Sequence, residues 1–471
     1  MVMMPKNAAD ARALQKATLA GVVYDKATDP EVGTLLDQLA DDQELGPFDA
    51  AVVRETRRAY ERTTKTPKRI AKRRAELESE GYQAWMVARE AKDFAKFAPV
   101  LEEWVALTRE ACSLIDPSRP AYDVALDEFE KGFTSARLDE VFSQLRDGLV
   151  PLLRDIRERG TPPDAGVLAG RFDTRVQAAL CEKIAVELGF NLDCGRLDVS
   201  VHPFTGGAHV TDVRMTTRFK EDDLTEGLTG AIHETGHALY EQGRNLEYDG
   251  LPVNEALSMG VHESQSLLWE RMVALGRPFS RYLAPKLAAS FPQLSAQLSP
   301  DTLYGALNVV KTRSMIRVEA DEVTYPLHII LRYELERGLV DGSVAVVDLP
   351  RLWNQKMTDY LGCTPADDGE GVLQDVHWSA GAMGYFPTYS LGAMYACQIY
   401  KAAAKDLPTL DDDIAAGKFS PLKAWLNVKI HKAGSLHQNG DELMIAATGA
   451  PLDPEIFLGY LREKYTELYK L

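Results

Sequence analysis

The sequence predicts a mainly α-helical protein that forms one large fold with a small β-hairpin or sheet. Apolar residues recur at helical spacing from the N-terminus to about Gly189 and again after residue 219. Between these parts lie two short stretches, 197–204 and 209–219, in which apolar and polar residues alternate as they do in strands. No internal repeat, low-complexity tract or clear interdomain linker divides the chain.

The composition is that of a globular protein, since 45% of its 471 residues are apolar and can fill a sizeable core. The net charge of -17 argues against nucleic acid and anionic membrane as partners, because such binding depends on clustered Lys and Arg. Five scattered cysteines without a C-x-x-C pair fit reduced thiols in a cytoplasmic protein. Residues 1–20 lack the pattern of a secretory signal, and no run of about 18 apolar residues spans a bilayer.

The first third is predicted to be helical throughout, as the spacing of Leu35, Leu36 and Leu39 illustrates. The proline-rich stretch 161–166 breaks this pattern. One part of the region, VRETRRAYERTTKTPKRIAKRRAE (53–76), is strongly basic and resembles an arm that binds nucleic acid. Acidic residues flank it and the whole chain is acidic, so we interpret it as a solvated helical face.

The alternating stretches LDVSVHPF (197–204) and HVTDVRMTTRF (209–219) predict a β-hairpin with its turn at residues 205–207. Side chains alternate between the two faces of a strand, so Asp212, Arg214 and Thr216 share one polar face of the second strand, and Val213 and Met215 lie on the other. We expect this polar face to look into a cleft.

The segment AIHETGHALYEQG (231–243) contains two histidines four residues apart with a glutamate between them. On a predicted helix from about 226 to 242, His233 and His237 share a face and can present two imidazoles to one metal ion. Glu234 lies beside them, where a carboxylate can take a proton from the attacking water. The alternative is an ordinary helix whose histidines and exposed glutamate have no common role.

A metal site of this kind needs a third protein ligand and leaves one position open for water. Glu255 lies in NEALS, which resembles the third-ligand motif N-E-x-x-S of thermolysin-like proteases, and Glu263 lies in HESQS. Spacing leaves both open, because both lie on a predicted second helix that can pack against the first. We interpret His262 as a hydrogen-bonding neighbour of the site and not as a ligand.

Six motifs together carry a more specific signal, and they occur in order between residues 202 and 378. They are HPF (202–204), DVRMT (212–216), HETGH (233–237), HESQ (262–265), IRVEAD (316–321) and GVLQDVHW (371–378). This set resembles that of the carboxypeptidase Taq family, the thermostable metallocarboxypeptidases. The resemblance implies a mainly α, neurolysin-like fold with a deep active-site cleft, and it assigns the third ligand to Glu263.

The lack of an interdomain linker and the change of pattern near residue 197 indicate how the chain is organised. We expect a single domain over 1–471, with an N-terminal helical part in 1–195 and a catalytic part that carries the metal site in 196–471. One divalent ion per chain is expected, with zinc in first place and cobalt or manganese as alternatives, because geometry and availability decide between such ions. The resemblance also implies a homodimer.

The segment DVHWSAGAMGYFPTY (375–389) supplies His377, Tyr385 and Tyr389 as hydrogen-bond donors for an oxyanion. By resemblance to the wider helical metallopeptidases, His377 and one tyrosine take this role, and Tyr389 is preferred. Each tyrosine has the alternative of simply packing over a glycine-rich loop. Asp375 is expected to orient a histidine of the site.

An enzyme that removes C-terminal residues must recognise a free carboxylate, which a planar guanidinium does with two parallel hydrogen bonds. On the grounds of the family, Arg317 of IRVEAD and His202 of HPF take this role. The alternative for Arg317 is a helical ion pair with Asp321, which can also orient the guanidinium. Arg214 is a weaker candidate for binding substrate, since it has the alternative of a structural ion pair with Asp212.

These residues predict a cytoplasmic, metal-dependent carboxypeptidase that releases single residues from peptide C-termini with Glu234 as general base. A helical oligopeptidase that cuts internally is the first rival, and it would not need Arg317 and His202. A non-catalytic peptide-binding protein is the second rival. A non-catalytic protein would be expected to lack a metal ligand or the general base, whereas His233, Glu234, His237 and Glu263 are all present.

Overall fold

The computed structural model describes residues 9–40 and 42–471, and it confirms a mainly α-helical fold with one small sheet. The α-helices are α1 (Ala9–Ala27), α2 (Pro30–Leu39), α3 (Pro47–Lys65), α4 (Lys68–Ala91), α5 (Ala98–Ile115), α6 (Ala121–Leu126), α7 (Ser135–Arg159), α8 (Thr174–Leu188), α9 (Leu224–Gly243), α10 (Met259–Leu267), α11 (Arg277–Ser290), α12 (Pro300–Leu307), α13 (Tyr325–Asp341), α14 (Leu349–Leu361), α15 (Pro387–Asp406), α16 (Leu410–Ala415), α17 (Ser420–Leu426), α18 (Gly440–Thr448) and α19 (Pro454–Tyr469). The strands are β1 (Gly195–Val199), β2 (Phe204–His209) and β3 (Asp212–Thr217).

Residues 1–8, which belong to the stretch where we expected no secretory signal, lie outside the described residues. None of the described helices combines the length and the apolar character that a membrane crossing demands.

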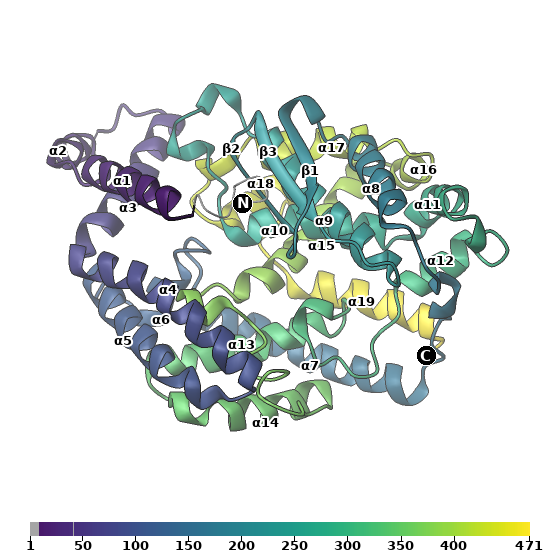
Figure 1. Cartoon of the computed structure of the whole chain (residues 1–471). Coiled ribbons are helices and arrows are strands. Elements are labelled where there is room, and N and C mark those ends of the chain that lie inside the picture. Colours follow the sequence, from purple (N-terminus) through teal and green to yellow (C-terminus); the bar gives the residue numbers. More distant parts are fainter. Residues whose placement is uncertain (1–8, 41) are drawn as a thin grey trace.

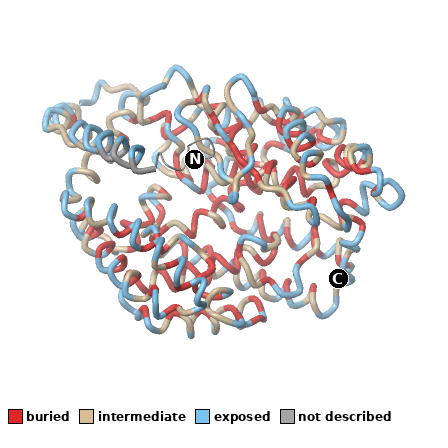
Figure 2. Tube along the Cα trace, viewed as in Figure 1, coloured by how far each residue is buried: buried red, intermediate tan, exposed pale blue. Residues whose placement is uncertain are grey.

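The helices occupy two parts of the view in Figure 1. Helices α4 to α7, together with α13 and α14, lie in its lower part, and the sheet with α8, α9 and α10 lies in its upper part. Buried residues run through the interior of both parts, and exposed residues line their outer surface (Figure 2). One cluster of buried apolar side chains extends from Ile70 in α4 to Tyr469 in α19, so both parts share a core. The division at residue 195 and the deep cleft stay predictions.

The sheet has the strand order β1-β3-β2, with β1 parallel and β2 antiparallel to β3. The predicted turn at residues 205–207 is therefore wrong, since these residues lie inside β2 and the hairpin turns at 210–211. A Cβ on Gly207 would lie 2.2 Å from the carbonyl oxygen of Asp212, and the register shifts between Gly207 and His209. The glycine marks a bulge where two strands approach closely.

The predicted alternation along β3 is confirmed for residues 212–215, whereas Thr216, expected on the polar face, is buried. Val213 and Met215 are buried, and the sulfur of Met215 lies 3.7 Å from the Thr235 hydroxyl of α9. The opposite face carries Asp212 and Arg214, whose side chains are exposed. Helix α9 thus packs on the apolar face of the sheet, and this contact fixes α9 against β2 and β3.

Helix α9 begins two residues before the predicted start, because Asp223 caps it. The Asp223 carboxylate accepts hydrogen bonds from the backbone N–H groups of Thr225 and Glu226. A Cβ on Gly236, in the middle of α9, would lie 2.5 Å from the carbonyl oxygen of Gln265 in α10. The backbones of α9 and α10 therefore touch, which brings the HETGH and HESQ motifs together.

The basic stretch 53–76 lies on α3 and α4, as the solvated-face interpretation predicts. Its arginine–carboxylate pairs are Arg54–Glu55, Arg57–Asp37, Arg58–Asp127, Arg62–Glu128, Arg69–Glu110 and Arg73–Glu103. These pairs give most of the arginines in the stretch a carboxylate partner.

Candidate metal centre and active site

His233 and His237 of α9 and Glu263 of α10 converge in the interior of the fold. The Glu263 Oε2 atom lies 3.2 Å from His237 Nε2 and 3.9 Å from His233 Nε2. One ligand atom from each residue lies within 4.8 Å of the other two. Two imidazoles and one carboxylate form the donor set of catalytic His₂Glu zinc sites, in which a fourth position stays open. The residues present therefore fit a divalent ion.

Glu255, the other candidate for the third ligand, lies outside this group. Its side chain is 70% exposed and pairs with Arg244 at 3.2 Å. It precedes α10, whereas Glu263 lies within that helix and faces α9. The structure thus brings Glu263 to the two histidines and does not bring Glu255.

Glu270 orients the first histidine. It lies in the π-helical segment Leu268–Ala274 that continues α10, and its carboxylate is 2.7 Å from His233 Nδ1. Because Nδ1–H donates to this carboxylate, the Nε2 lone pair is left for a metal ion. Sequence reasoning missed Glu270, although its position seven residues after Glu263, two helical turns on, was the available signal.

A chain of hydrogen bonds orients the second histidine. His237 Nδ1 lies 2.6 Å from His262 Nδ1, and His262 Nε2 lies 2.8 Å from the Glu241 carboxylate. Burial acts to raise the pKa of Glu241, but His262 and Arg244 lower it to about 2, so Glu241 accepts and His262 Nε2–H donates. With the proton on Nε2, His262 Nδ1 can accept from His237 Nδ1–H, which leaves the His237 Nε2 lone pair for an ion between the histidines and Glu263.

This arrangement agrees with the interpretation of His262 as a hydrogen-bonding neighbour. Glu241 was missed, although it follows His237 by four residues on the same helical face. The two histidines are thus fixed by carboxylates that come from different elements, Glu270 for His233 and Glu241 through His262 for His237.

The site concentrates negative charge around the histidines. Burial would raise the pKa of Glu263, but His233 and His237 lower it to about 2, so the carboxylate is ionised. Burial would lower the pKa of His233, yet Glu263 and Glu270 raise it to about 10. A positive charge is therefore strongly favoured here, and a divalent cation bound by these residues would supply it in place of a proton.

Glu234 lies between the two histidines and is only 6% exposed, so the alternative of an exposed helix glutamate does not hold. Its Oε2 atom accepts a hydrogen bond from the Thr205 hydroxyl at 2.6 Å. Thr205 belongs to β2, and the same hydroxyl lies 3.0 Å from the Glu234 backbone oxygen. Sequence reasoning placed Thr205 in a turn and missed this contact.

Arg317 lies in a single 3-10 turn, Arg317–Glu319, and its guanidinium is buried. The alternative, a helical ion pair with Asp321, does not form, because the segment is too short to make the helix that this spacing requires. Asp321 instead accepts the backbone N–H groups of Lys311 and Val323. The partner of Arg317 is Asp375, at 2.8 Å.

Asp375 joins two buried arginines. Its Oδ1 atom accepts from Arg317, and its Oδ2 atom accepts from Arg332 Nε at 2.6 Å. Although burial acts in the opposite direction, these two cations hold the pKa of Asp375 well below its usual range. Asp375 does not orient His377 as expected, since its nearest oxygen is 4.0 Å from His377 Nδ1 and is already engaged.

His377, Tyr385 and Tyr389 form an aromatic group beside Arg317. His377 Nε2 lies 2.9 Å from the Tyr389 hydroxyl, and the ring of Tyr385 lies 5.5 Å from that of His377. The Arg317 guanidinium lies 4.8 Å from the centre of the Tyr389 ring. Burial and the charge of Arg317 lower the pKa of His377 to about 3, so its imidazole is neutral.

Tyr325 is a further member of this group that the sequence did not indicate. Its hydroxyl accepts from Arg317 Nη1 at 2.8 Å, and its ring stacks 4.9 Å from the guanidinium carbon of Arg271. It follows Arg317 by eight residues across a loop, so no helical or strand periodicity links the two.

The two remaining candidates lie on the surface. His202 is exposed in the loop that precedes β2. Arg214 pairs with Asp212 at 2.8 Å, as the alternative of a structural ion pair predicts. No contact in the described structure joins either side chain to the metal triad or to Arg317.

Comparison with known proteins places this chain in a family. The chain matches the profile of the carboxypeptidase Taq (M32) metallopeptidases over residues 1–465. It is 40% identical to "Thermostable carboxypeptidase 1" of Thermus thermophilus and 38% identical to "Carboxypeptidase 1" of Bacillus subtilis, in both cases over 99% of this chain and 93% of the relative.

Solved structures support the same family assignment. The M32 carboxypeptidase of Deinococcus radiodurans R1 superposes with a TM-score of 0.95 at 37% identity, over 100% of this chain and 94% of that one. The metallocarboxypeptidase 1 of Trypanosoma cruzi gives a TM-score of 0.94 at 39% identity, over 98% and 93% of the two chains. The chain therefore belongs to the carboxypeptidase Taq (M32) family and is a metal-dependent carboxypeptidase of mainly helical fold.

Proposed function

We propose that this enzyme releases single residues from the C-termini of peptides and that His233, His237 and Glu263 hold its divalent ion, with zinc in first place. The observation that carries the proposal is the convergence of this triad with the neighbouring carboxylate of Glu234. An ion bound to the triad would polarise the scissile carbonyl and lower the pKa of the water that attacks it.

Glu234 serves as the general base. Its carboxylate lies on α9 between the two histidines, and the hydrogen bond from Thr205 fixes its orientation. It takes a proton from the attacking water and passes it to the leaving amine, which requires the carboxylate to stay close to both. Thr205 occupies one lone pair of Oε2, so Oε1 is left to accept the proton.

Neutral donors stabilise the oxyanion. Burial raises the pKa of both Tyr385 and Tyr389, so both phenols remain protonated and can donate. Tyr389 is held by His377 at 2.9 Å, and the two therefore act as one unit, with Tyr385 beside them. Fixed donors in a buried site stabilise developing charge more than mobile water does.

Arg317 recognises the terminal carboxylate. A guanidinium has five N–H groups, and Asp375 and Tyr325 engage three of those of Arg317. The two that remain, one on each terminal nitrogen, suit a bidentate carboxylate. Asp375 and Tyr325 hold the guanidinium in place, which lowers the entropy that substrate binding costs. His202 and Arg214 stay further candidates for contact with the peptide.

The resemblance also supports a homodimer as a proposal. A cytoplasmic location is proposed because all five cysteines are free and four of them are buried, which suits a reducing compartment.

The assignment of the third ligand can be tested by metal content. Glu263→Ala should lose the ion on dialysis, because the substitution removes a direct bond, whereas Glu255→Ala should retain about one ion per chain. Metal analysis after dialysis and a thermal unfolding curve for each variant give the result. Retention by Glu263→Ala together with loss by Glu255→Ala would restore the thermolysin-like assignment.

The role of Glu234 can be tested by an isosteric change. Glu234→Gln should lower kcat by about 10² to 10⁴, the usual contribution of a general base, and should leave metal content and the unfolding temperature nearly unchanged. Glu247→Gln, on an exposed residue, serves as the matched control. A Glu234→Gln enzyme that keeps most of its activity would show that another group takes the proton.

The role of Arg317 can be tested with paired substrates. Hydrogen bonds to charged groups contribute roughly 1.5 to 3 kcal/mol each, so losing two should lower kcat/KM on free peptides by at least about a hundredfold. The wild type should discriminate strongly against C-terminally amidated peptides, and Arg317→Ala should cleave both forms weakly with little preference.

Exposed Arg313 offers the control substitution, Arg313→Ala. The ratio of the two rates is the decisive readout, since a loss of folded protein lowers both rates equally. An unchanged preference in Arg317→Ala would remove this residue from its role. Equal cleavage of both peptides by the wild type would favour an oligopeptidase.

A further inference from the structure

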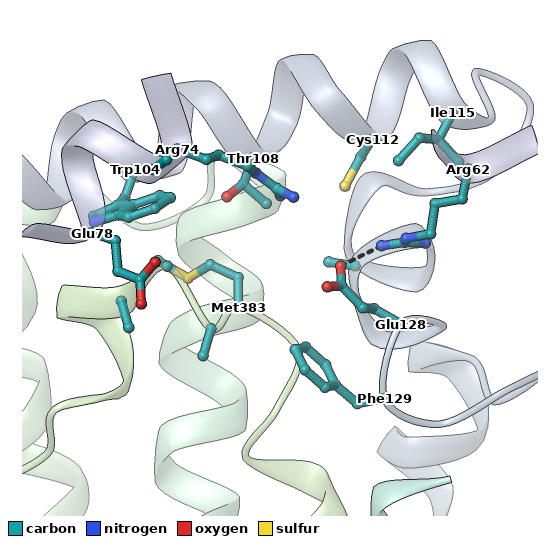
Figure 3. A pocket seen from close by; sticks show the side chains of 15 residues that line it. Arg62, Arg74, Glu78, Trp104, Thr108, Cys112, Ile115, Glu128, Phe129 and Met383 are labelled. Atoms are coloured by element: carbon teal, nitrogen blue, oxygen red, sulfur yellow. Dashed lines mark hydrogen bonds and ion pairs between the residues drawn. The ribbon is translucent and has the colours of Figure 1, made fainter. Parts of the chain in front are cut away.

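A second site lies away from the metal triad, between helices α4 and α5 and the loop 380–383. It is a cavity of about 330 Å³ (Figure 3). Trp104, Phe129 and Met383 give it apolar walls, and Arg74 and Thr108 bring polar groups to it. Its volume is at the lower end of the range for small-molecule sites, which combine apolar walls with a few polar groups.

Thr108 contributes a hydroxyl that has no hydrogen-bond partner among the described residues. The residue is 1% exposed, and it lies in the middle of α5. A helical threonine normally donates to the carbonyl group four residues earlier, and leaving a buried hydroxyl without a partner is unfavourable. A valine of the same shape would avoid this cost, so the hydroxyl is best explained by a ligand atom that it meets.

Arg74 contributes a positive charge without a counter-ion. It is the one arginine of the basic stretch 53–76 that has no carboxylate within 4.0 Å in the described part of the chain, and its Nε atom is buried without a partner. Its neighbour Arg73, by contrast, pairs with Glu80 and Glu103 at 2.9 and 2.6 Å. The exposed Glu78 also lines the cavity but does not reach Arg74.

The opposite wall is already neutralised. Figure 3 shows Arg62 and Glu128 facing each other there, and their side chains pair at 2.5 Å. The positive charge that is still available to bind an anion in this cavity is therefore that of Arg74, and the unpartnered hydroxyl of Thr108 also lines the cavity. We propose that the cavity binds a small apolar carboxylate, with its carboxylate group on Arg74 and Thr108 and its hydrocarbon part against Trp104, Phe129 and Met383.

The cavity adjoins the loop that carries the catalytic group. Trp104 Nε1 donates to the backbone oxygen of Ser379 at 3.2 Å, and a Cβ on Gly381 would lie 2.3 Å from the Trp104 ring. On the same side, the ring of Phe129 lies 5.0 Å from that of Tyr385. A ligand against Trp104 and Phe129 thus contacts side chains that pack on the loop of His377 and on the ring of Tyr385. Its binding should therefore change kcat.

Two chemical sources share this ligand chemistry, a free amino acid and a simple carboxylic acid. Equilibrium dialysis of the metal-loaded full chain with leucine, 4-methylpentanoate and leucinamide separates them. Binding of leucine alone indicates an amino-acid site, and binding of both carboxylates indicates a site that needs no ammonium group. Leucinamide lacks the carboxylate and should bind at least about tenfold more weakly.

Variants identify the site. Arg74→Gln and Thr108→Val should each weaken binding of the carboxylate, by about tenfold or more for Arg74→Gln, and should remove its effect on kcat. Arg73→Gln, one residue away on the same helix, is the matched control and should bind as the wild type does. Thr108→Val should also unfold at a higher temperature than the wild type without ligand, because it loses an unsatisfied hydroxyl.

Dialysis reports binding whether or not the enzyme cleaves peptides as proposed, so a failure of the proposed function would not be mistaken for a failure of this site. Equal binding by Arg74→Gln and Arg73→Gln would overturn the proposal, as would equal binding of leucine and leucinamide. Purely competitive inhibition that Arg74→Gln leaves unchanged would place the carboxylate in the peptide site instead.

Discussion

The arrangement of His233, His237 and Glu263 depends on how closely α10 packs against α9 and α15. At both contacts the backbones approach so closely that only a glycine fits. A Cβ on Gly236 of α9 would lie 2.5 Å from the Gln265 carbonyl oxygen, and a Cβ on Gly392 of α15 would lie 2.8 Å from the Glu263 side chain. A larger residue at either position would push α10 outward. Glu263 reaches the two histidines because α10 is held between these glycines, and the same contact brings α15, which carries Tyr389, to the triad.

Burial of charge is the second constraint. Taking an ion out of water is unfavourable unless partners surround it, so the groups of the active site occur in connected sets. Asp375 stands between Arg317 and Arg332, and Glu270 and Glu263 face His233. Each set fixes the direction of a group that we propose meets the substrate or the ion. The fixed orientation of these side chains thus follows from the free energy that burying their charges costs.

Local periodicity accounts for what the sequence could predict. The spacing of His233 and His237 predicted the helix and the shared face, and the alternation along β3 predicted its buried side. Spacing did not decide whether Glu255 or Glu263 is the third metal ligand, and only the family resemblance favoured Glu263. The choice depends on how α10 packs, which is a tertiary contact.

The errors have the same origin. The alternative that Asp321 pairs with Arg317 rested on local spacing, but Asp375, 58 residues further along, takes that role. The glycines of β2 were interpreted as a turn because glycine marks both turns and bulges. Thr205 was missed as the partner of Glu234 for the same reason, since its place in a strand beside α9 became visible only in the fold.

The central claim is that this chain is a metal-dependent exopeptidase that acts at the C-terminus. The most direct measurement follows an N-terminally acetylated peptide of defined sequence by mass spectrometry, with metal-loaded protein and with protein stripped by a chelator. The account predicts a series of products that shorten by one residue at a time from the C-terminus with the metal, and no products without it. Internal fragments, or undiminished cleavage after the metal is removed, would contradict it.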